Sequence, residues 1–374
     1  MSGQRIASID VARGLVMLLM TVDHARETFF LQHQVADPMD VATTDPALFF
    51  TRLAAHFCAP MFVFLTGLSA WLYAHPQAGP RDPTAFLVKR GLLMIGLEIV
   101  IVNFAWTGTF MPATVYLQVM WAIGLSMLAL ALLHRLPLAV VAVLGLAIVA
   151  GHNALAGVTF EPGTFGAAAW TILEQRGFLA DGPVRVKISY PVLAWIGVIL
   201  LGYACGPLFA RGVAPLRRKH MLLLAGTLCL ALLVVLRTAN VYGEPVLWAA
   251  QADALHNVMA YLNFTKYPPS LDFLLLTLGC GLLALAALEG RASAFTRIAA
   301  VFGGAPLFYY LLHLYLLLIL GRIAAAALGV ARADVAHVWQ VWLIAVLVAL
   351  ALYWPTRWFG QVKRTSGKGW VKYL

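Results

Sequence analysis

Four ionisable side chains follow one another closely in an apolar stretch near the start of the chain. The segment MTVDHARETFF holds Asp23, His24, Arg26 and Glu27 directly after the run GLVMLLM. On a helix, Asp23 lies one turn from both Arg26 and Glu27 and can pair with the first of them. Histidine titrates near neutral pH, and a neighbouring carboxylate can fix its tautomer and orientation. The spacing therefore indicates a site that could handle protons.

A second apolar stretch carries a matching pair of residues. Arg52 and His56 stand four residues apart in PALFFTRLAAHFCAPMFVFLTGLSAWLY. This stretch is predicted to run antiparallel to the first and to touch it, because consecutive elements usually pack together. The first stretch ends and the second begins at the same, outer face of the membrane. Measured from that face, His56 lies about as deep as Asp23, and Arg52 lies about as deep as Glu27. We therefore expect both histidines near Asp23, and Arg52 near Glu27.

Two interpretations of this cluster stay open. Buried ion pairs can simply hold two helices together, which needs no chemistry. Ionisable side chains in a membrane segment cost about 2.5–3.5 kcal/mol each on insertion scales, so they also mark polar cavities and proton pathways. Two histidines beside a carboxylate favour a polar cavity that handles protons. His313, in PLFYYLLHLYLLL, is a further candidate for this cavity, although a lone histidine on an apolar helix is more often a hydrogen-bonded core residue.

The elements that position these residues are expected to be membrane helices. Of the 374 residues, 62% are hydrophobic and 11% are charged, whereas soluble domains carry about 25% charged residues. The apolar runs are long and continuous, while the strands of a membrane barrel alternate. We therefore predict an all-α polytopic bundle that forms a single integral-membrane domain over residues 1–374. About ten spans are expected, at 6–30, 47–74, 84–106, 115–134, 137–157, 189–210, 219–239, 271–289, 301–326 and 338–358.

The distribution of charge supports this arrangement. With the N-terminus in the cytoplasm, the cytoplasmic loops carry most of the basic residues and the opposite loops carry most of the acidic ones, which is the positive-inside bias. An even number of spans then places both termini in the cytoplasm. The formal net charge of +10 is explained by contact with anionic lipid head groups, so no nucleic-acid partner is expected.

Several common signatures of other functions are missing from the sequence. It contains no P-loop, no GxGxxG after a predicted strand, no HExxH and no GxSxG. The cysteines lie inside apolar runs, and no His, Cys or Asp cluster has the spacing of a metal site. The sequence therefore does not support ATP-driven transport, nicotinamide chemistry or zinc hydrolysis, and no bound metal is expected.

Several longer stretches resemble one known family. RIASIDVARGLVMLLMTVDHARETFF and FFTRLAAHFCAPMFVFLTGLSAWL are similar to the start of the heparan-α-glucosaminide N-acetyltransferase-like membrane proteins, and most resemble the bacterial branch. LQVMWAIGLSM, YPVLAWIGVILLGYACG, TKYPPSLDFLLLTLG, PLFYYLLHLYL and TRWFGQVKRTSGKGWVKYL follow in the family's order. The resemblance implies an acetyltransferase of the bacterial cytoplasmic (inner) membrane. Such an enzyme takes acetyl-CoA from the cytoplasm and acetylates a sugar amine or hydroxyl at the outer face.

The resemblance also implies a catalytic histidine near the outer end of the first span. In the family this histidine follows an asparagine by about three helical turns. Asp23 occupies the position of the asparagine, and the histidine then corresponds to His33, in FFLQHQV, with the spacing one residue off. His24 is the competing candidate, because it lies within the span. Both candidates stay open.

The expected chemistry assigns roles to the remaining polar residues. Acyl transfer needs a base for the proton of the acceptor, and His24 or His33 would serve, oriented by Asp23, with His56 as a second proton handler. Donors to the developing oxyanion are expected among Arg26, Arg52 and Asn103, and Glu27 completes the predicted catalytic set. Residues expected to contact the coenzyme are Arg13, Lys89, Arg90, Gln118 and His313, together with the basic loop at 211–219.

Two other functions remain open on the sequence. A proton-coupled secondary transporter would also use intramembrane carboxylates and histidines. Against this, the ionisable residues crowd into the first two predicted spans, whereas transporters often place such features at matching positions of two halves. A non-catalytic membrane scaffold is the third function. The expected partners are lipid, acetyl-CoA and a glycan or other small acceptor, and the oligomeric state is left open, a homo-oligomer included.

Overall fold

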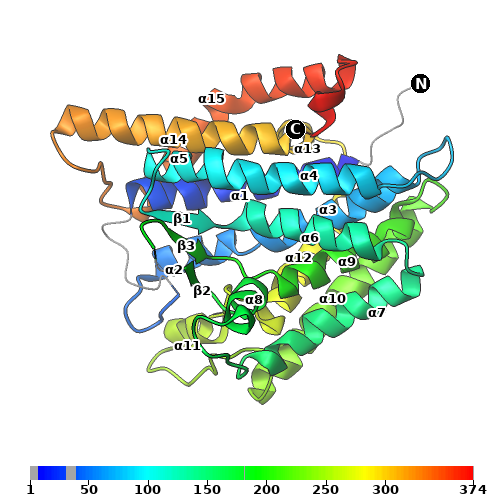
Figure 1. Cartoon of the computed structure of the whole chain (residues 1–374), viewed down its shortest axis with the longest axis horizontal. Coiled ribbons are helices and arrows are strands. Elements are labelled where there is room, and N and C mark those ends of the chain that lie inside the picture. Colours follow the sequence, from blue (N-terminus) through cyan, green and yellow to red (C-terminus); the bar gives the residue numbers. More distant parts are fainter. Residues whose placement is uncertain (1–6, 31–38, 181, 374) are drawn as a thin grey trace. The chain divides into compact units, whose positions relative to one another are not determined.

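The computed structural model describes residues 7–30, 39–180 and 182–373 and is mostly helical (Figure 1). The chain divides into two compact units. The first unit comprises Met1–Cys58, Trp248–Asn263 and Ala284–Leu374, and the second comprises Ala59–Leu247 and Phe264–Leu283.

Among the described residues, 6 helical segments are long and apolar enough to cross a membrane. They are Pro46–Ala74, Leu138–Leu155, Pro215–Ala239, Leu271–Leu288, Pro306–Leu328 and Val338–Thr365. Three further apolar helices are shorter than a bilayer-crossing helix, at Val119–Leu133, Leu193–Ala204 and Ala294–Gly304. The helical membrane class is therefore confirmed, whereas the number of about ten spans and the cytoplasmic position of both termini stay predictions.

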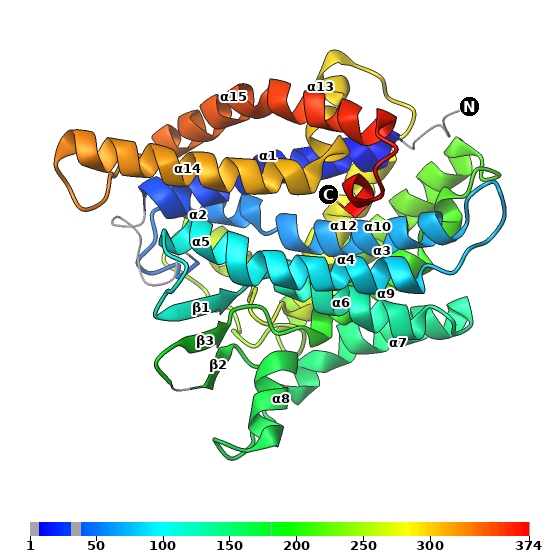
Figure 2. The same cartoon turned by 45° about the horizontal axis from the view of Figure 1, so that its top comes forward.

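The first unit is built around helix α1 (Ala7–Phe29). Three helices from the end of the chain pack on it, namely α13 (Ala294–Gly304), α14 (Pro306–Leu328) and α15 (Val338–Thr365) (Figures 1 and 2). The approach of α1 to α13 is close enough to require glycine on both helices. A Cβ atom at Gly14 would overlap the carbonyl oxygen of Ala299, and one at Gly303 would overlap that of Asp10. Small residues commonly allow such backbone contact between membrane helices.

The second predicted span is divided into two helices in the structure. Helix α2 (Pro46–Ala55) ends before a turn at His56 and Phe57, and α3 (Cys58–Ala74) follows. The start of α2 is well specified, because the Asp45 side chain accepts a hydrogen bond from the N–H of Ala47 and proline is favoured in the first turn.

Contacts on two sides hold α2 within the first unit. Phe49 is fully buried in a cluster with Met39, Val41 and Met259, the last of which lies on α11 (Ala254–Tyr261). On another side, the indole Nε1 of Trp342 on α15 donates to the Thr51 hydroxyl at 3.0 Å. These contacts orient the end of α2 that carries Arg52.

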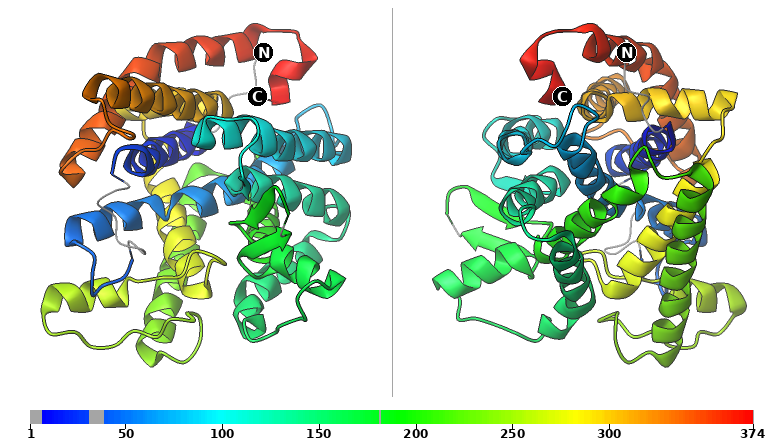
Figure 3. Two further views of the ribbon diagram at one scale, coloured as in Figure 1. Left: turned by 60° about the vertical axis from the view of Figure 1, so that its left-hand side comes forward. Right: turned by 90° about the vertical axis from the view of Figure 1, so that its right-hand side faces the viewer.

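The second unit contains pairs of closely packed helices. Helix α4 (Thr84–Leu97) packs on α6 (Val119–Leu133), and α7 (Leu138–Gly151) packs on α9 (Leu193–Ala204). Gly91 and Gly124 bring α4 and α6 together, since a Cβ at either position would press on the other's carbonyl oxygen. Helix α10 (Pro215–Ala239) lies against α12 (Leu271–Leu288), with Gly226 facing the carbonyl oxygen of Gly279 (Figure 3).

A π-helical turn at Glu98–Val102 interrupts the third predicted span before α5 (Asn103–Thr107). The turn directs the Glu98 carboxylate to the start of α6, where it accepts hydrogen bonds from the N–H groups of Met120 at 2.9 Å and Trp121 at 3.2 Å. The first N–H groups of a helix have no partner within the helix, and a carboxylate satisfies them well. Glu98 thus links α4 to α6.

A small sheet accompanies the helices and corrects the all-α prediction. Its strands are β1 (Thr114–Leu117), β2 (Gly177–Ala180) and β3 (Arg185–Ile188), in the order β1-β3-β2 (Figure 1). β1 is parallel to β3, and β2 is antiparallel to it. The short helix α8 (Phe165–Leu173) precedes β2. Residues 115–117, predicted as the start of the fourth span, belong to β1. A short apolar run fits a strand or a helix, and the β-branched and aromatic residues of this one favour the strand.

Candidate functional site

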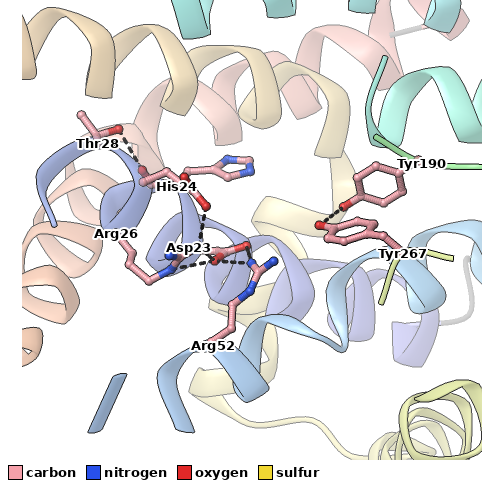
Figure 4. Close-up of polar contacts among 8 residues, drawn as sticks. Asp23, His24, Arg26, Thr28, Arg52, Tyr190 and Tyr267 are labelled. Atoms are coloured by element: carbon pink, nitrogen blue, oxygen red, sulfur yellow. Dashed lines mark hydrogen bonds and ion pairs between the residues drawn. The ribbon is translucent and has the colours of Figure 1, made fainter. Parts of the chain in front are cut away.

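The ionisable residues of α1 and α2 form one cluster of ion pairs, the Asp23 cluster (Asp23, Arg26, Glu27 and Arg52). Asp23 Oδ1 accepts from Arg26 Nε at 3.1 Å and from Arg26 Nη2 at 2.8 Å. Arg52 Nη1 lies 2.9 and 2.7 Å from the two Asp23 oxygens. Arg26 Nη2 also donates to Glu27 at 2.5 Å. Figure 4 shows Arg26 and Arg52 converging on Asp23 from the two helices.

The Asp23 cluster is largely shielded from solvent. The side chains of Arg26, Arg52 and Asp23 are 1%, 12% and 13% exposed. The fourth member, Glu27, is 37% exposed. The two anions balance the two cations, which offsets the cost of burying the other three side chains. Removing one member would leave an uncompensated charge, so the cluster strongly constrains how α2 meets α1.

Beside this cluster, His24 and His313 form a second polar contact. His24 Nδ1 lies 2.7 Å from His313 Nε2, and the two rings are nearly parallel, with an interplanar angle of 4°. His313 is fully buried on α14, whereas His24 is half-buried on α1. The His313 Nδ1 atom lies 2.9 Å from the carbonyl oxygen of Tyr309. A chain of hydrogen bonds therefore runs from α1 to the backbone of α14.

When both imidazoles are neutral, this chain of hydrogen bonds sets the tautomer of each. A carbonyl oxygen only accepts, so Nδ1 of His313 must carry a proton and donate it to Tyr309. The Nε2 atom of neutral His313 is then an acceptor, and Nδ1 of His24 must donate to it. The lone pair of neutral His24 is consequently placed on Nε2. A histidine held in one tautomer by a second group is the usual arrangement of a general base.

Aromatic and hydroxyl groups surround the histidine pair. The Tyr309 hydroxyl lies 2.7 Å from the Thr21 hydroxyl on α1, and the Tyr309 ring stacks on His313 with centroids 5.2 Å apart. The Tyr310 ring meets His24 edge to face at 5.9 Å. Thr21, Tyr309 and Tyr310 were not among the site residues predicted from the sequence. The signal available for Tyr309 was its position four residues before His313, on the same face of the helix.

The structure brings several of the predicted catalytic residues together. Asp23, Arg26, Glu27 and Arg52 share the ion cluster, but Arg52 contacts Asp23, about one turn from its expected partner Glu27. The His24 Nδ1 atom is bonded to a second histidine, whereas a carboxylate was expected in that role.

The two other histidine candidates are placed differently. His56 is buried at the turn after α2, where its N–H bonds to the carbonyl of Leu53 at 3.0 Å. His33 lies outside the described residues.

The residues predicted to contact a coenzyme have varied surroundings. In the first unit, the Nη1 atom of Arg13 lies 3.4 Å from the Oδ1 atom of Asp10. His313 lies in the histidine pair with His24.

The other three coenzyme candidates belong to the second unit. Lys89 is exposed on α4, Arg90 lies over the Phe86 ring at 5.9 Å, and Gln118 precedes α6 as its N-cap.

Asn103, an expected oxyanion donor, uses its side chain for internal links in the second unit. Its Nδ2 donates to the carbonyl oxygens of Glu98 at 2.7 Å and Tyr116 at 2.9 Å, and its Oδ1 accepts from the Tyr116 N–H at 2.7 Å. Both N–H groups and the carbonyl of the amide are therefore occupied in holding β1 against α5. This geometry favours a structural role for Asn103.

The comparison with known families agrees with this architecture. No curated protein gives a significant match to the chain. The family described as heparan-alpha-glucosaminide N-acetyltransferase, catalytic, matches residues 5–220, which is more than half of the 374 residues. The matched range includes α1 and α2, with His24 and the whole Asp23 cluster, and ends before α14. With its long apolar helices, the chain is an integral membrane protein, and it belongs to the heparan-alpha-glucosaminide N-acetyltransferase catalytic family of membrane acetyltransferases.

Proposed function

We propose that the protein transfers an acetyl group from acetyl-CoA to the amine or hydroxyl of a sugar, with His24 as the general base. The observation that carries this proposal is the hydrogen bond between His24 Nδ1 and His313 Nε2 at 2.7 Å. In the neutral pair it leaves the basic lone pair on His24 Nε2. Family membership supplies the class of reaction, and the histidine pair supplies a base suited to it.

The proposed reaction proceeds by direct transfer. His24 Nε2 takes a proton from the acceptor as its nitrogen or oxygen attacks the thioester carbonyl carbon. The new bond to carbon forms, the carbon–sulfur bond breaks, and the imidazolium returns the proton to the departing thiolate of coenzyme A. His313 would hold the His24 ring in place through both steps, because its own Nδ1 stays bonded to the Tyr309 carbonyl.

The Asp23 cluster would supply electrostatic stabilisation. Negative charge develops on the thioester oxygen during attack, and a guanidinium near that oxygen lowers the barrier. Arg52 is the better candidate, since its side chain is 12% exposed and that of Arg26 only 1%. Asp23 holds Arg52 in a fixed orientation through both carboxylate oxygens.

The remaining parts of the proposal concern the donor and the membrane. Acetyl-CoA would approach from the cytoplasmic side, with Arg13 of the first unit as a candidate contact for its phosphates. The acceptor would be acetylated at the outer face of a bacterial inner membrane by a single catalytic domain with both termini in the cytoplasm. The positive-inside bias of the loops supports this orientation.

An acetylation assay tests the proposal. The full chain, purified in detergent, is mixed with isotopically labelled acetyl-CoA and glucosamine, and labelled product is counted. His24→Ala should lower the rate by about 10²- to 10⁴-fold, the usual contribution of a general base. His256→Ala, at a partly exposed histidine of α11, serves as the control and should keep the rate.

Two further variants separate the competing assignments. His33→Ala and His56→Ala should each retain most of the activity. Loss of activity in His33→Ala with normal activity in His24→Ala would move the base to His33. If the wild-type chain forms no product but drives proton-coupled solute uptake in proteoliposomes, the protein is a transporter and the proposal fails.

A further inference from the structure

The hairpin of β2 and β3 in the second unit gathers cations on an aromatic ring. Arg185 and Lys187 stand two residues apart on β3, so their side chains leave the same face of the strand. The Arg185 guanidinium carbon lies 5.1 Å from the centre of the Phe178 ring, and the Lys187 Nζ lies 5.5 Å from it. Phe178 is the direct partner of Lys187 across the two strands.

The ring of Tyr267, in the same unit, contacts two further cationic side chains. The Arg176 guanidinium carbon lies 5.0 Å from the centre of the Tyr267 ring, and the Lys266 Nζ lies 5.3 Å from it. The Tyr267 hydroxyl donates to the Tyr190 hydroxyl at 3.2 Å (Figure 4). This bond fixes the ring on which the cations lie. Lys266 is only 7% exposed, so we call the three other side chains, Arg176, Arg185 and Lys187, the hairpin cations.

The hairpin cations repel one another electrostatically. Burial lowers the pKa of Lys187 below its ordinary value of 10.5, and the nearby charges of Arg176 and Arg185 lower it further. In the part of the chain that the structure describes, no acidic side chain forms an ion pair with any of the three. Cation–π contacts offset only part of this repulsion. A bound anion would offset the remaining repulsion between the cations.

The hairpin also exposes apolar side chains next to these charges. Phe178 is 43% exposed and Val184 is 46% exposed. A soluble anion would use the cations but leave these two side chains in water. The interface of a bilayer satisfies both features, because phosphate groups lie beside the start of the acyl chains.

We propose that the hairpin cations bind the phosphate group of an anionic phospholipid, with Phe178 and Val184 in contact with the adjoining acyl region. The guanidinium groups of Arg176 and Arg185 can each donate two N–H groups to one phosphate, while Lys187 acts as a point charge. The hairpin then holds the sheet at the membrane surface. This site lies in the second unit and is independent of the acetyl-transfer chemistry proposed for His24.

Retention of lipid by the purified protein tests the site. The full chain is equilibrated in detergent with phosphatidylglycerol or phosphatidylcholine, and native mass spectrometry counts the retained molecules. The wild type should retain phosphatidylglycerol preferentially. R176Q/R185Q/K187Q should weaken that retention by about fivefold for each cation removed. Arg185→Lys keeps the charge and should keep most of the binding.

A matched variant separates a local site from overall charge. R291Q/R297Q/R332Q removes the same number of exposed cations from the first unit and should lower phosphatidylglycerol retention much less than R176Q/R185Q/K187Q does. Equal retention by the wild type and R176Q/R185Q/K187Q would overturn the proposal. So would charge-dependent binding of inorganic phosphate or a soluble sulfated oligosaccharide without any preference for phosphatidylglycerol. If the triple variant fails to fold, single Arg185→Gln, at an exposed position, replaces it and should weaken phosphatidylglycerol retention about fivefold; unchanged retention in that variant would equally overturn the proposal.

Discussion

The Nδ1 atom of His24 and the Nε2 atom of His313 lie 2.7 Å apart, which joins α1 to α14 through two imidazole rings. The contact connects residues 289 positions apart in the sequence. Because the far ring is anchored on the carbonyl of Tyr309, the orientation of His24 depends on α14. A change at His313 should therefore act through His24.

Replacing His313 separates positioning from coenzyme binding. His313→Ala removes the acceptor of the His24 proton, so the His24 ring can rotate out of line. We expect kcat to fall by about a hundredfold, the typical effect of misplacing a catalytic group, with little change in the KM for acetyl-CoA. His313→Gln offers an amide oxygen at a similar reach and should recover part of the loss. Steady-state kinetics with purified variants measure both constants.

A double variant provides the control for this coupling. If His313 acts only through His24, H24A/H313A should be no slower than His24→Ala alone, because residues that work as a unit are not additive. A rise in the KM for acetyl-CoA with an unchanged kcat in His313→Ala would instead support the coenzyme contact expected from the sequence.

Removing Asp23 should destabilise the first unit more than removing Arg52. Asp23→Ala leaves Arg26 buried and Arg52 nearly so without their shared anion, and breaking such a buried pair typically costs about 3–5 kcal/mol. Arg52→Ala leaves Asp23 paired with Arg26 and should cost less. Unfolding in detergent by a denaturing surfactant measures both.

The double variant tests whether the loss comes from uncompensated charge. D23A/R52A removes one anion and one cation, so it should be less destabilised than the sum of the two single variants. Simple additivity would mean that the two side chains do not interact in solution, contrary to the 2.7 Å contact between them.

The sequence predicted the Asp23 cluster because charges in an apolar run must find partners. It also placed Arg52 within about one turn of its true partner. It could not predict that α2 ends at Ala55 before a turn, which separates the short helix that carries Arg52 from the rest of the predicted span.

Sequence patterns could not identify the partner of His24. Helical spacing states which residues share a face of one helix, but it does not state which distant helix covers that face. His313 was selected as a cavity residue, yet its link to His24 required the packing of α14 on α1. Strand β1 was missed for a related reason, since a short apolar run fits a buried strand as well as a helix, whereas β2 and β3 lie between the spans predicted at 137–157 and 189–210.

The loop before α4 should contribute a pH-dependent stability. Hydrogen bonds from the Thr84 hydroxyl and N–H, and then from Arg135, hold the pKa of Asp82 well below its ordinary value of 3.8. A carboxyl group whose pKa is lower in the folded state stabilises the fold above its unfolded pKa. That contribution is lost as pH falls through the folded pKa.

Asp82→Asn isolates this contribution. The wild type should melt above the variant at neutral pH, and the difference should shrink once the pH drops below about 4. Melting temperatures of both proteins across a pH series give the comparison. A difference that stays constant down to the lowest pH would show that the ionised form of Asp82 is not preferentially stabilised in the folded chain.

Alanine substitutions at two adjacent glycines at the end of α13 should have opposite effects on stability, because only one of these glycines contacts α1. A Cβ at Gly303 would overlap the carbonyl group of Asp10 and press on the N–H of Gly14, whereas a Cβ at Gly304 would meet nothing within 4 Å. Backbone atoms cannot rotate away, so Gly303→Ala must push the helices apart and should cost about 1–3 kcal/mol of unfolding free energy. Gly304→Ala should be neutral or slightly stabilising, because alanine loses less backbone entropy in a helix.

Because α1 also carries His24, Gly303→Ala should lower acetyl transfer as well, while Gly304→Ala keeps it. Equal unfolding midpoints for the two variants would mean that α1 and α13 do not meet at this crossing.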